Sequence, residues 1–170
     1  MLMDELTIQV IAIGGIFTLA FVVTGVILLI KMPRGKVAEV EVVPDHPFEL
    51  ACAPANGKHY KLWVRYSAAY DLGPDGGFGI TLDLDGKVGD EVVLDHPLGI
   101  GGDQAPEVEL VQNTEMFAKR NRGPGGGTRA ATMMLYDLGP RPRGSEIVIR
   151  GTVTARPATT VLGLKLWIAR

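Results

Sequence analysis

The sequence predicts an all-β globular domain, a β-sandwich, on one N-terminal transmembrane α-helix. Three observations predict it: an uncharged apolar run near the start, apolar and polar residues that alternate with period two through much of the rest, and a content of 22 Gly and 11 Pro among 170 residues. Gly and Pro weaken helix interiors and form the turns between strands. About eight or nine short strands are expected, and a jelly roll is one sandwich arrangement that accommodates them.

The predicted transmembrane helix spans residues 7–30, a run without a charged side chain in which Gln9 is the one strongly polar residue. A helix of this length extends for roughly 36 Å, which is enough to cross a bilayer with some tilt. Residues 1–6 then form a short tail, 31–36 a basic juxtamembrane linker and 37–170 the β-sandwich domain. A cleaved signal peptide is disfavoured, because the start is acidic and no small-residue cleavage site follows the apolar run.

The charges beside the predicted helix indicate its orientation. Lys31, Arg34 and Lys36 follow it, whereas no Lys or Arg precedes it. The positive-inside rule then places the N-terminus outside and the β domain in the cytoplasm. The reverse orientation stays open, because long domains can be translocated regardless of charge.

Small residues lie on one side of the predicted helix. Gly14 and Thr18 are four residues apart, and Gly25 follows on nearly the same face. Such spacing lets another helix approach closely, so we expect these residues to pack on other membrane-protein subunits. The alternative is that the glycines reflect only their general frequency in membrane helices.

Four segments alternate regularly enough to predict half-buried strands, because successive side chains of a strand point to opposite faces. They span residues 59–66, 78–85, 147–154 and 162–169. The residues expected to face the core are Tyr60, Leu62, Val64, Tyr66, Phe78, Ile80, Leu82, Leu84, Ile147, Ile149, Gly151, Val153, Leu162, Leu164, Leu166 and Ile168. Weaker strand candidates are 38–43, 48–52, 91–94, 107–111 and 131–136. Expected turns are at 56–57, 74–77 and 85–86, and a flexible Gly-rich loop is expected at 123–128.

The chain repeats two short motifs in the same order. The heptapeptide at 41–47 recurs at 91–97 with six identities, and the pentapeptide at 70–74 recurs unchanged at 136–140. This pattern predicts an internal duplication. Two copies are too few for a solenoid, so they are expected to form two halves of one sandwich related by an approximate two-fold axis.

Charge is distributed unevenly along the chain, although the net charge is only −2. Residues 37–118 contain 4 Lys and Arg against 15 Asp and Glu, a net of −11, and residues 119–170 contain 10 against 2, a net of +8. The two halves are expected to pack together and neutralise each other, or to turn a basic face toward acidic lipid or protein. Nucleic acid is not expected as a partner, because the domain is acidic overall and contains no recognisable binding module.

A basic cluster flanks the Gly-rich segment. Near an anionic membrane, each of these side chains could contribute about 1 kcal/mol to lipid binding, while the alternative is a solvated basic loop. The cluster consists of Lys119, Arg120, Arg122 and Arg129.

The repeated Asp-His-Pro motif raises the question of a metal site. A two-fold axis could bring Asp45, His46, Asp95 and His96 together, but turns at strand ends explain the same residues more simply. Residues 83–91 lack the full pattern of a calcium loop and are interpreted as a hairpin. No catalytic, cofactor-binding or metal-binding residue is therefore assigned, and the protein is not expected to be an enzyme.

Trp63 and Trp167 are predicted on outward strand faces, beside Arg65 and Lys165. Trp together with Arg is typical of interface cores, so Trp63, Arg65 and Trp167 are expected to contact a partner, unless the domain's own loops cover them. The expected function is a non-catalytic, single-pass accessory or scaffold subunit of a larger membrane complex, for example an energy-transducing assembly. The alternatives are a membrane-tethered module that binds a metal ion or carbohydrate and, less favoured, a sensor of the lipid surface.

Overall fold

The computed structural model describes residues 35–53, 58–72, 77–102, 107–111 and 116–170. They belong to a compact unit, Gly35–Arg170, in which the described residues form eleven strands and no helix. The strands are β1 (Lys36–Glu41), β2 (Phe48–Cys52), β3 (His59–Asp71), β4 (Gly79–Val88), β5 (Glu91–Leu94), β6 (Pro97–Gly101), β7 (Glu109–Leu110), β8 (Met116–Gly123), β9 (Gly126–Pro140), β10 (Ile147–Ala155) and β11 (Thr159–Ala169).

The predicted transmembrane helix at 7–30 lies outside the described residues, and so do its packing residues Gly14, Thr18 and Gly25. The same holds for the tail at 1–6 and for all of the basic linker before Gly35. Within the part of the chain that is described, no helix has the length and apolar character needed to span a membrane.

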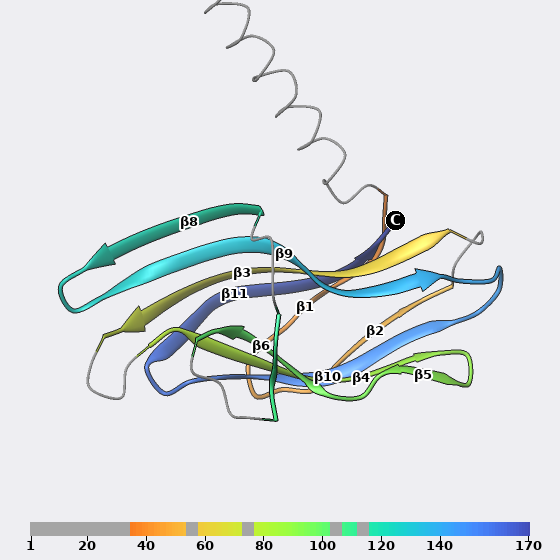
Figure 1. Ribbon diagram of the computed structural model, residues 1–170, viewed down its shortest axis with the longest axis horizontal. Helices are drawn as coiled ribbons and strands as arrows, with labels where there is room; N and C mark the ends of the chain where they lie inside the picture. Colours follow the sequence, from red (N-terminus) through yellow and green to blue (C-terminus); the bar gives the residue numbers. More distant parts are fainter. Residues whose placement is uncertain (1–34, 54–57, 73–76, 103–106, 112–115) are drawn as a thin grey trace, which may run out of the picture. The chain divides into compact units, whose positions relative to one another are not determined.

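The strands form two sheets that lie as two layers, as Figure 1 shows. The five-stranded sheet has the order β1-β11-β3-β9-β8. The six-stranded sheet has the order β2-β10-β4-β6-β7, with β5 beside β4. All pairings are antiparallel except that of β6 with β7. The predicted all-β, sandwich-like fold is thus confirmed.

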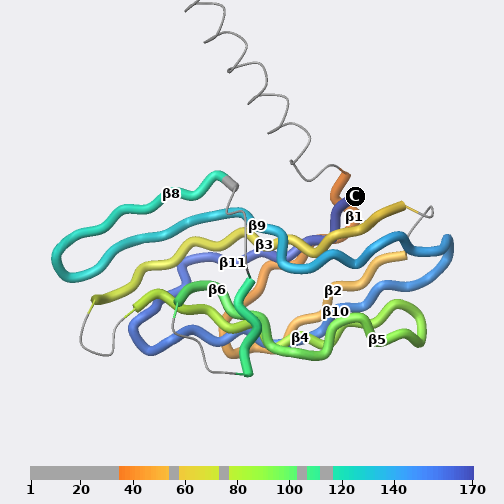
Figure 2. Tube along the Cα trace, in the orientation of Figure 1, coloured from red at the N-terminus to blue at the C-terminus, as the bar shows by residue number. Residues whose placement is uncertain are grey.

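Strands early in the chain pair with strands late in it, in nested order. The first strand, β1, pairs with the last, β11; β2 pairs with β10, and β3 with β9 (Figure 2). Successive strands β1, β2, β3 and β4 alternate between the two sheets. This nesting ties the two ends of the unit together, since Lys36 is paired with Ala169.

The core lies between the sheets and is built from the alternation seen in the sequence. Every expected core-facing apolar side chain except Leu162 is buried, and together these side chains form one cluster. Burying large apolar side chains contributes about 1.5–3 kcal/mol each before the entropy of ordering is counted. The period-two pattern therefore predicted both the strands and the direction in which they face.

Leu162 is the exception, and its side chain is 63% exposed. The register of β11 against β3 shifts between Val161 and Gly163, which marks a β-bulge. Because a bulge inserts one residue, the alternation is out of phase before it and in phase after it. The prediction that Leu162 faces the core is therefore wrong, while Leu164, two residues later, is buried as predicted.

The Gly-rich segment expected to be a flexible loop is instead a tight hairpin that joins β8 to β9. Gly123 pairs with Gly126 across this turn. A Cβ on Gly126 would lie 2.3 Å from the Tyr70 carbonyl oxygen, so only glycine lets β9 approach β3 this closely. The prediction of a flexible loop is wrong because glycines of this segment allow β9 to pack closely against β3.

The expected hairpin turn at 85–86 is also wrong. Asp85 and Gly86 lie inside β4, where they pair with Arg150 and Ile149 of β10. The chain turns after Val88 instead, where Gly89 has a φ of +58°. Pairing along the whole of β10 outweighs the local turn preference of Asp-Gly.

The two copies of the heptapeptide lie in different surroundings. The first follows β1 and leads into β2, so it crosses from one sheet to the other. The second contains β5 and leads into β6, and both of these strands pair with β4. The internal duplication stays a prediction, since these connections are not equivalent.

The single cysteine, Cys52, ends the edge strand β2. Burial raises the pKa of its thiol to about 11, from an ordinary value of 9.0. Since the thiolate is the reactive form, we expect alkylation of the folded protein by iodoacetamide to be slow at pH 8 and to rise steeply until the pH approaches about 11. Unfolding in urea should increase the rate at pH 8.

The raised pKa of Cys52 also makes the stability of the fold depend on pH. The folded-state pKa lies above the unfolded one, so the contribution of Cys52 is complete below about pH 9 and is lost as the pH rises toward about 11. A rate of alkylation in the folded protein that reaches its plateau near pH 9 would contradict this account. A Cys52→Ser variant is the control, because it lacks the thiol and shows how much alkylation occurs at other groups.

Candidate functional site

A groove of about 430 Å³ crosses the outer face of the five-stranded sheet. It is lined by residues from all five strands, which makes it the place where the sheet brings the most distant parts of the sequence together. The polar residues that line it are Lys36, Glu39, Glu41, Arg65, Ser67, Thr132 and Lys165. Phe117 of β8 lies at its edge and is 61% exposed.

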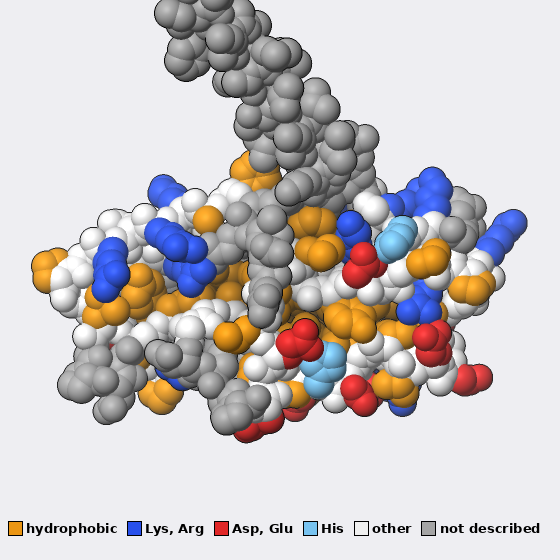
Figure 3. Space-filling view, in the orientation of Figure 1, with side chains coloured by type: hydrophobic (Ala, Val, Ile, Leu, Met, Phe, Trp, Pro, Cys, Tyr) orange, Lys and Arg blue, Asp and Glu red, His pale blue; other side chains and the backbone are white. Residues whose placement is uncertain are grey.

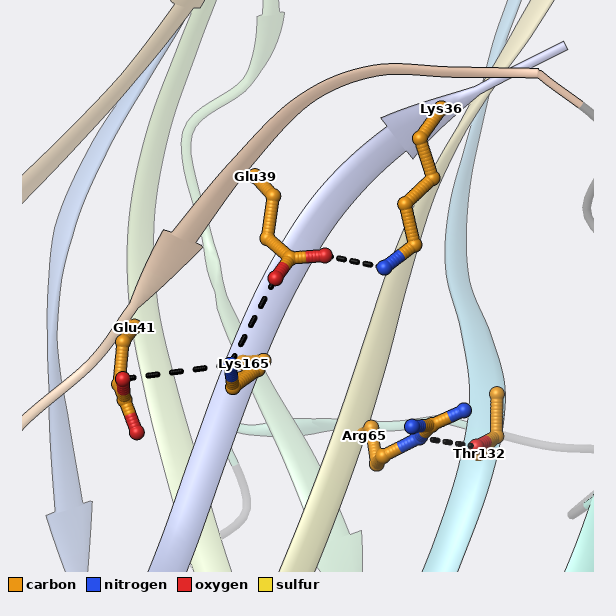
Figure 4. A network of polar contacts seen from close by, with 6 residues as sticks. All are labelled: Lys36, Glu39, Glu41, Arg65, Thr132 and Lys165. Carbon is orange, nitrogen blue, oxygen red and sulfur yellow. Dashed lines mark hydrogen bonds and ion pairs between the residues drawn. The ribbon is translucent and has the colours of Figure 1, made fainter.

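Two glutamates of β1 pair with two lysines along one side of the groove (Figure 4). Lys165 Nζ lies 3.6 Å from Glu39 Oε1 and 3.9 Å from Glu41 Oε2, and Lys36 donates a hydrogen bond to Glu39. The hydrogen bond from Lys36, with the charges of both lysines, lowers the pKa of Glu39. These pairs are solvent-exposed, so they contribute little to stability and mainly set the local charge.

Arg65 lies on the other side of Lys165, on β3. Its Nε donates a hydrogen bond of 3.2 Å to Thr132 Oγ1 of β9, as Figure 4 shows. Among the described residues no carboxylate contacts its guanidinium group. The strand register explains this position, because Arg65 is paired with Lys165 on one side and with Thr132 on the other. Within the described part of the chain, Arg65 is thus a cation of the groove that has no carboxylate beside it.

Trp63 and Trp167 stack beside the groove, with ring centroids 6.3 Å apart and planes 10° from parallel. They form a second apolar cluster, with Ala169 and Met134, separate from the main core. Lys36 Nζ lies 5.1 Å from the centroid of the Trp167 ring. Both side chains thus point away from the main core between the sheets, which is the outward direction predicted from the sequence.

The two indoles are nevertheless buried, at 6% exposed for Trp63 and 2% for Trp167. Neither indole nitrogen has a hydrogen-bond partner among the described residues. Little of either indole is therefore accessible in this structure, and the expected contact of Trp63 and Trp167 with a partner stays a prediction. Arg65 and Phe117 are among the exposed residues of this face, together with Lys36, Glu39 and Glu41.

The predicted basic cluster is divided between the two faces of the sheet. Lys119 pairs with Ala130, which lines the groove, whereas Arg120 pairs with Arg129. The guanidinium carbon of Arg129 lies 4.7 Å from the ring centroid of Phe78, a residue of the main core. Arg122 is exposed near the β8–β9 turn. Of this cluster, Lys119 alone shares the face of Arg65.

Charge of opposite sign is separated between the layers. In Figure 3 most acidic side chains lie over the six-stranded sheet and most basic ones over the five-stranded sheet. A second groove, of about 640 Å³, crosses the outer face of the six-stranded sheet and is lined by Glu49, Asp83, Asp85, Asp95 and Arg150. Arg150 Nε donates a hydrogen bond of 2.6 Å to Glu49.

The repeated Asp-His pairs do not meet. The described residues contain no group of three or more His, Cys, Asp or Glu side chains arranged to hold a metal ion. Asp45 adopts a turn conformation with a φ of +61°, and His46 Nδ1 lies 3.0 Å from the Pro44 carbonyl oxygen. His96 Nε2 lies 2.8 Å from the Glu109 carboxylate, a close approach without hydrogen-bond geometry.

Several groove residues were not singled out from the sequence. Glu39 and Glu41 alternate along β1, and this period could have placed them on one face. Ser67 follows Arg65 by two residues on β3, so the same rule applies. Phe117 carried no signal, because β8 was not predicted as a strand.

No family model matches this chain, and a search of curated proteins found no similar sequence.

Proposed function

We propose that this protein is a non-catalytic, single-pass membrane subunit that docks a partner protein on the outer face of its five-stranded sheet. The observation that supports it best is the groove, where an exposed phenylalanine and an arginine that contacts no carboxylate of the described residues lie on one face. Arg and aromatic side chains, including Phe, are enriched in the cores of protein interfaces.

In this proposal the apolar run at 7–30 is the membrane anchor. Lys36 opens β1, so only a short linker separates the predicted helix from the first strand. Because this proposal holds the protein in a membrane, a membrane protein is the natural partner. We retain the cytoplasmic orientation of the β domain from the positive charges after the helix. The helix would pack on the partner through Gly14, Thr18 and Gly25.

We further infer that the sandwich is a jelly roll. The nested pairing of β1 with β11, β2 with β10 and β3 with β9, in two layers, is the arrangement that two Greek keys generate. Such a fold leaves both outer sheet faces available, and each of them carries a groove here.

The second candidate function is a tethered ligand-binding module. The groove on the six-stranded sheet favours it, because the carboxylates of Asp83, Asp85 and Asp95 line it. Carboxylates and an arginine are suitable hydrogen-bonding groups for the hydroxyls of a carbohydrate. In this case the protein would be purified without a partner subunit.

The proposal is tested by gentle detergent extraction of the tagged full-length protein, followed by sizing and mass spectrometry. We expect a large complex with a stoichiometric partner. Gly163→Trp should remove most of that partner, because a Cβ added at Gly163 meets no atom within 4 Å, so the backbone tolerates a side chain there, and an indole would fill the groove.

Thr152→Trp is the matched control, since it places the same side chain in the groove of the other sheet. It should leave the complex intact, and circular dichroism should show that both variants fold. Elution of the wild-type protein alone would overturn the docking proposal. Loss of the partner with Thr152→Trp but not with Gly163→Trp would transfer the docking site to the six-stranded sheet.

A further inference from the structure

We infer that the groove contains an anion subsite centred on Arg65, which takes a carboxylate side chain from an extended segment of the partner. This inference rests on the proposed docking function and names the chemistry of the segment that is bound.

The charges that line the groove indicate an anion. Three cations, Lys36, Arg65 and Lys165, face two carboxylates, Glu39 and Glu41. Both lysines contact Glu39, and Lys165 also lies near Glu41. The surplus positive charge is therefore located at Arg65, and the carboxylates on β1 would repel an anion placed at the opposite side of the groove.

The hydrogen bond to Thr132 gives Arg65 a defined orientation. It uses Nε, one of five N–H donors, so the remaining donors on the two Nη atoms are available to a ligand. A planar guanidinium fork matches a carboxylate with two parallel hydrogen bonds, which are stronger than neutral ones. The hydroxyl of Ser67 lines the same groove and can donate to the same anion.

Phe117 favours a peptide over a small free anion. Its φ is +56°, a conformation that bulky residues rarely adopt, and its side chain is 61% exposed at the edge of the groove. Backbone strain of this kind is concentrated at binding sites. Small residues, Ala130 and Gly163, leave room between Phe117 and the charged side. An extended segment that crosses the groove would place an apolar side chain on Phe117 and a carboxylate on Arg65.

The test uses the full-length protein in uncharged detergent micelles, with nuclear magnetic resonance signals of the Arg65 side chain and of the β9 and β11 amides as readout. The probe is a blocked peptide with a central Glu between two Leu residues, and the same peptide with Gln is the control. We expect the Glu peptide to shift Arg65 Nε–H and to bind about tenfold more tightly than the Gln peptide.

Arg65→Gln should remove this preference for Glu. Arg150→Gln, which changes an exposed arginine of the other sheet, should keep it. Equal binding of the two peptides, or no shift at Arg65, would overturn the inference. Tight binding of inorganic phosphate with no response to the Glu peptide would also overturn it, and would indicate a phosphate or lipid headgroup as ligand.

The two proposals fail separately. If the native complex survives Arg65→Gln unchanged and the Glu peptide does not bind, docking stands and the anion subsite falls. If the Glu peptide binds Arg65 but no partner is ever extracted with the protein, the subsite stands and the proposed subunit role falls.

Discussion

Trp63→Ala is expected to lower the free energy of unfolding by about 3 kcal/mol, at the lower end of what truncation of a buried Trp costs. The reason is that Trp63 stacks on Trp167 across the β3–β11 pair and is only 6% exposed. Removing it leaves Trp167 without its stacking partner. The indole N–H without a hydrogen-bond partner disappears too, and this partly offsets the loss.

The measurement is denaturant unfolding of the full-length protein in micelles, followed by circular dichroism. Phe117→Ala is the control, because its exposed side chain should change the free energy of unfolding by no more than about 0.5 kcal/mol. If Trp63→Ala left stability unchanged, the Trp cluster would not hold this sheet together. It would then be better explained as contact area for a partner.

Gly101→Ala is expected to destabilise the fold by about 3 kcal/mol or more. Gly101 ends β6 with a φ of +110°, which L-residues rarely adopt, and an added Cβ would lie 2.4 Å from the Phe78 carbonyl oxygen. Backbone strain contributes about 1–3 kcal/mol, and overpacking contributes a further ~1–3 kcal/mol.

Gly144→Ala separates these two contributions. Gly144 also has a positive φ, of +86°, but a Cβ there would meet nothing within 4 Å. Its replacement should therefore cost only the backbone part, about 1–2 kcal/mol. Equal losses in the two variants, measured by the same unfolding experiment, would show that contact with Phe78 has no effect.

The strands that alternate were predictable, because burial of one sheet face imposes a period of two on the sequence. β2 and β5 were predicted with their observed bounds, and β10 within one residue. β6 and β8 were missed. β6 is buried along most of its length and shows no alternation, while β8 is an edge strand whose residues 117–123 are all exposed. Neither environment leaves a period-two signal.

The candidate site was predictable only in part. Trp63, Arg65 and Trp167 were assigned to outward faces from alternation alone, and the structure places all three on the same sheet face. Burial of the two indoles was not foreseeable, since alternation indicates which sheet face a side chain lies on but not whether other residues bury it there. The pairing of Lys165 with Glu39 and Glu41 depends on which strands are neighbours, and no local pattern specifies that β1 lies beside β11.

The pairing of β1 with β11 also determines when this protein can fold. β4 and β5 are joined by a short turn and can form early, but each outer strand pair closes a longer stretch of chain than the pair inside it. Folding dominated by such distant contacts is slow. During synthesis β1 emerges before the other described strands and has no strand to pair with until β11 has also emerged. The edge of the growing sheet therefore stays open until β11 is available, and aggregation or chaperone binding is decided in that interval.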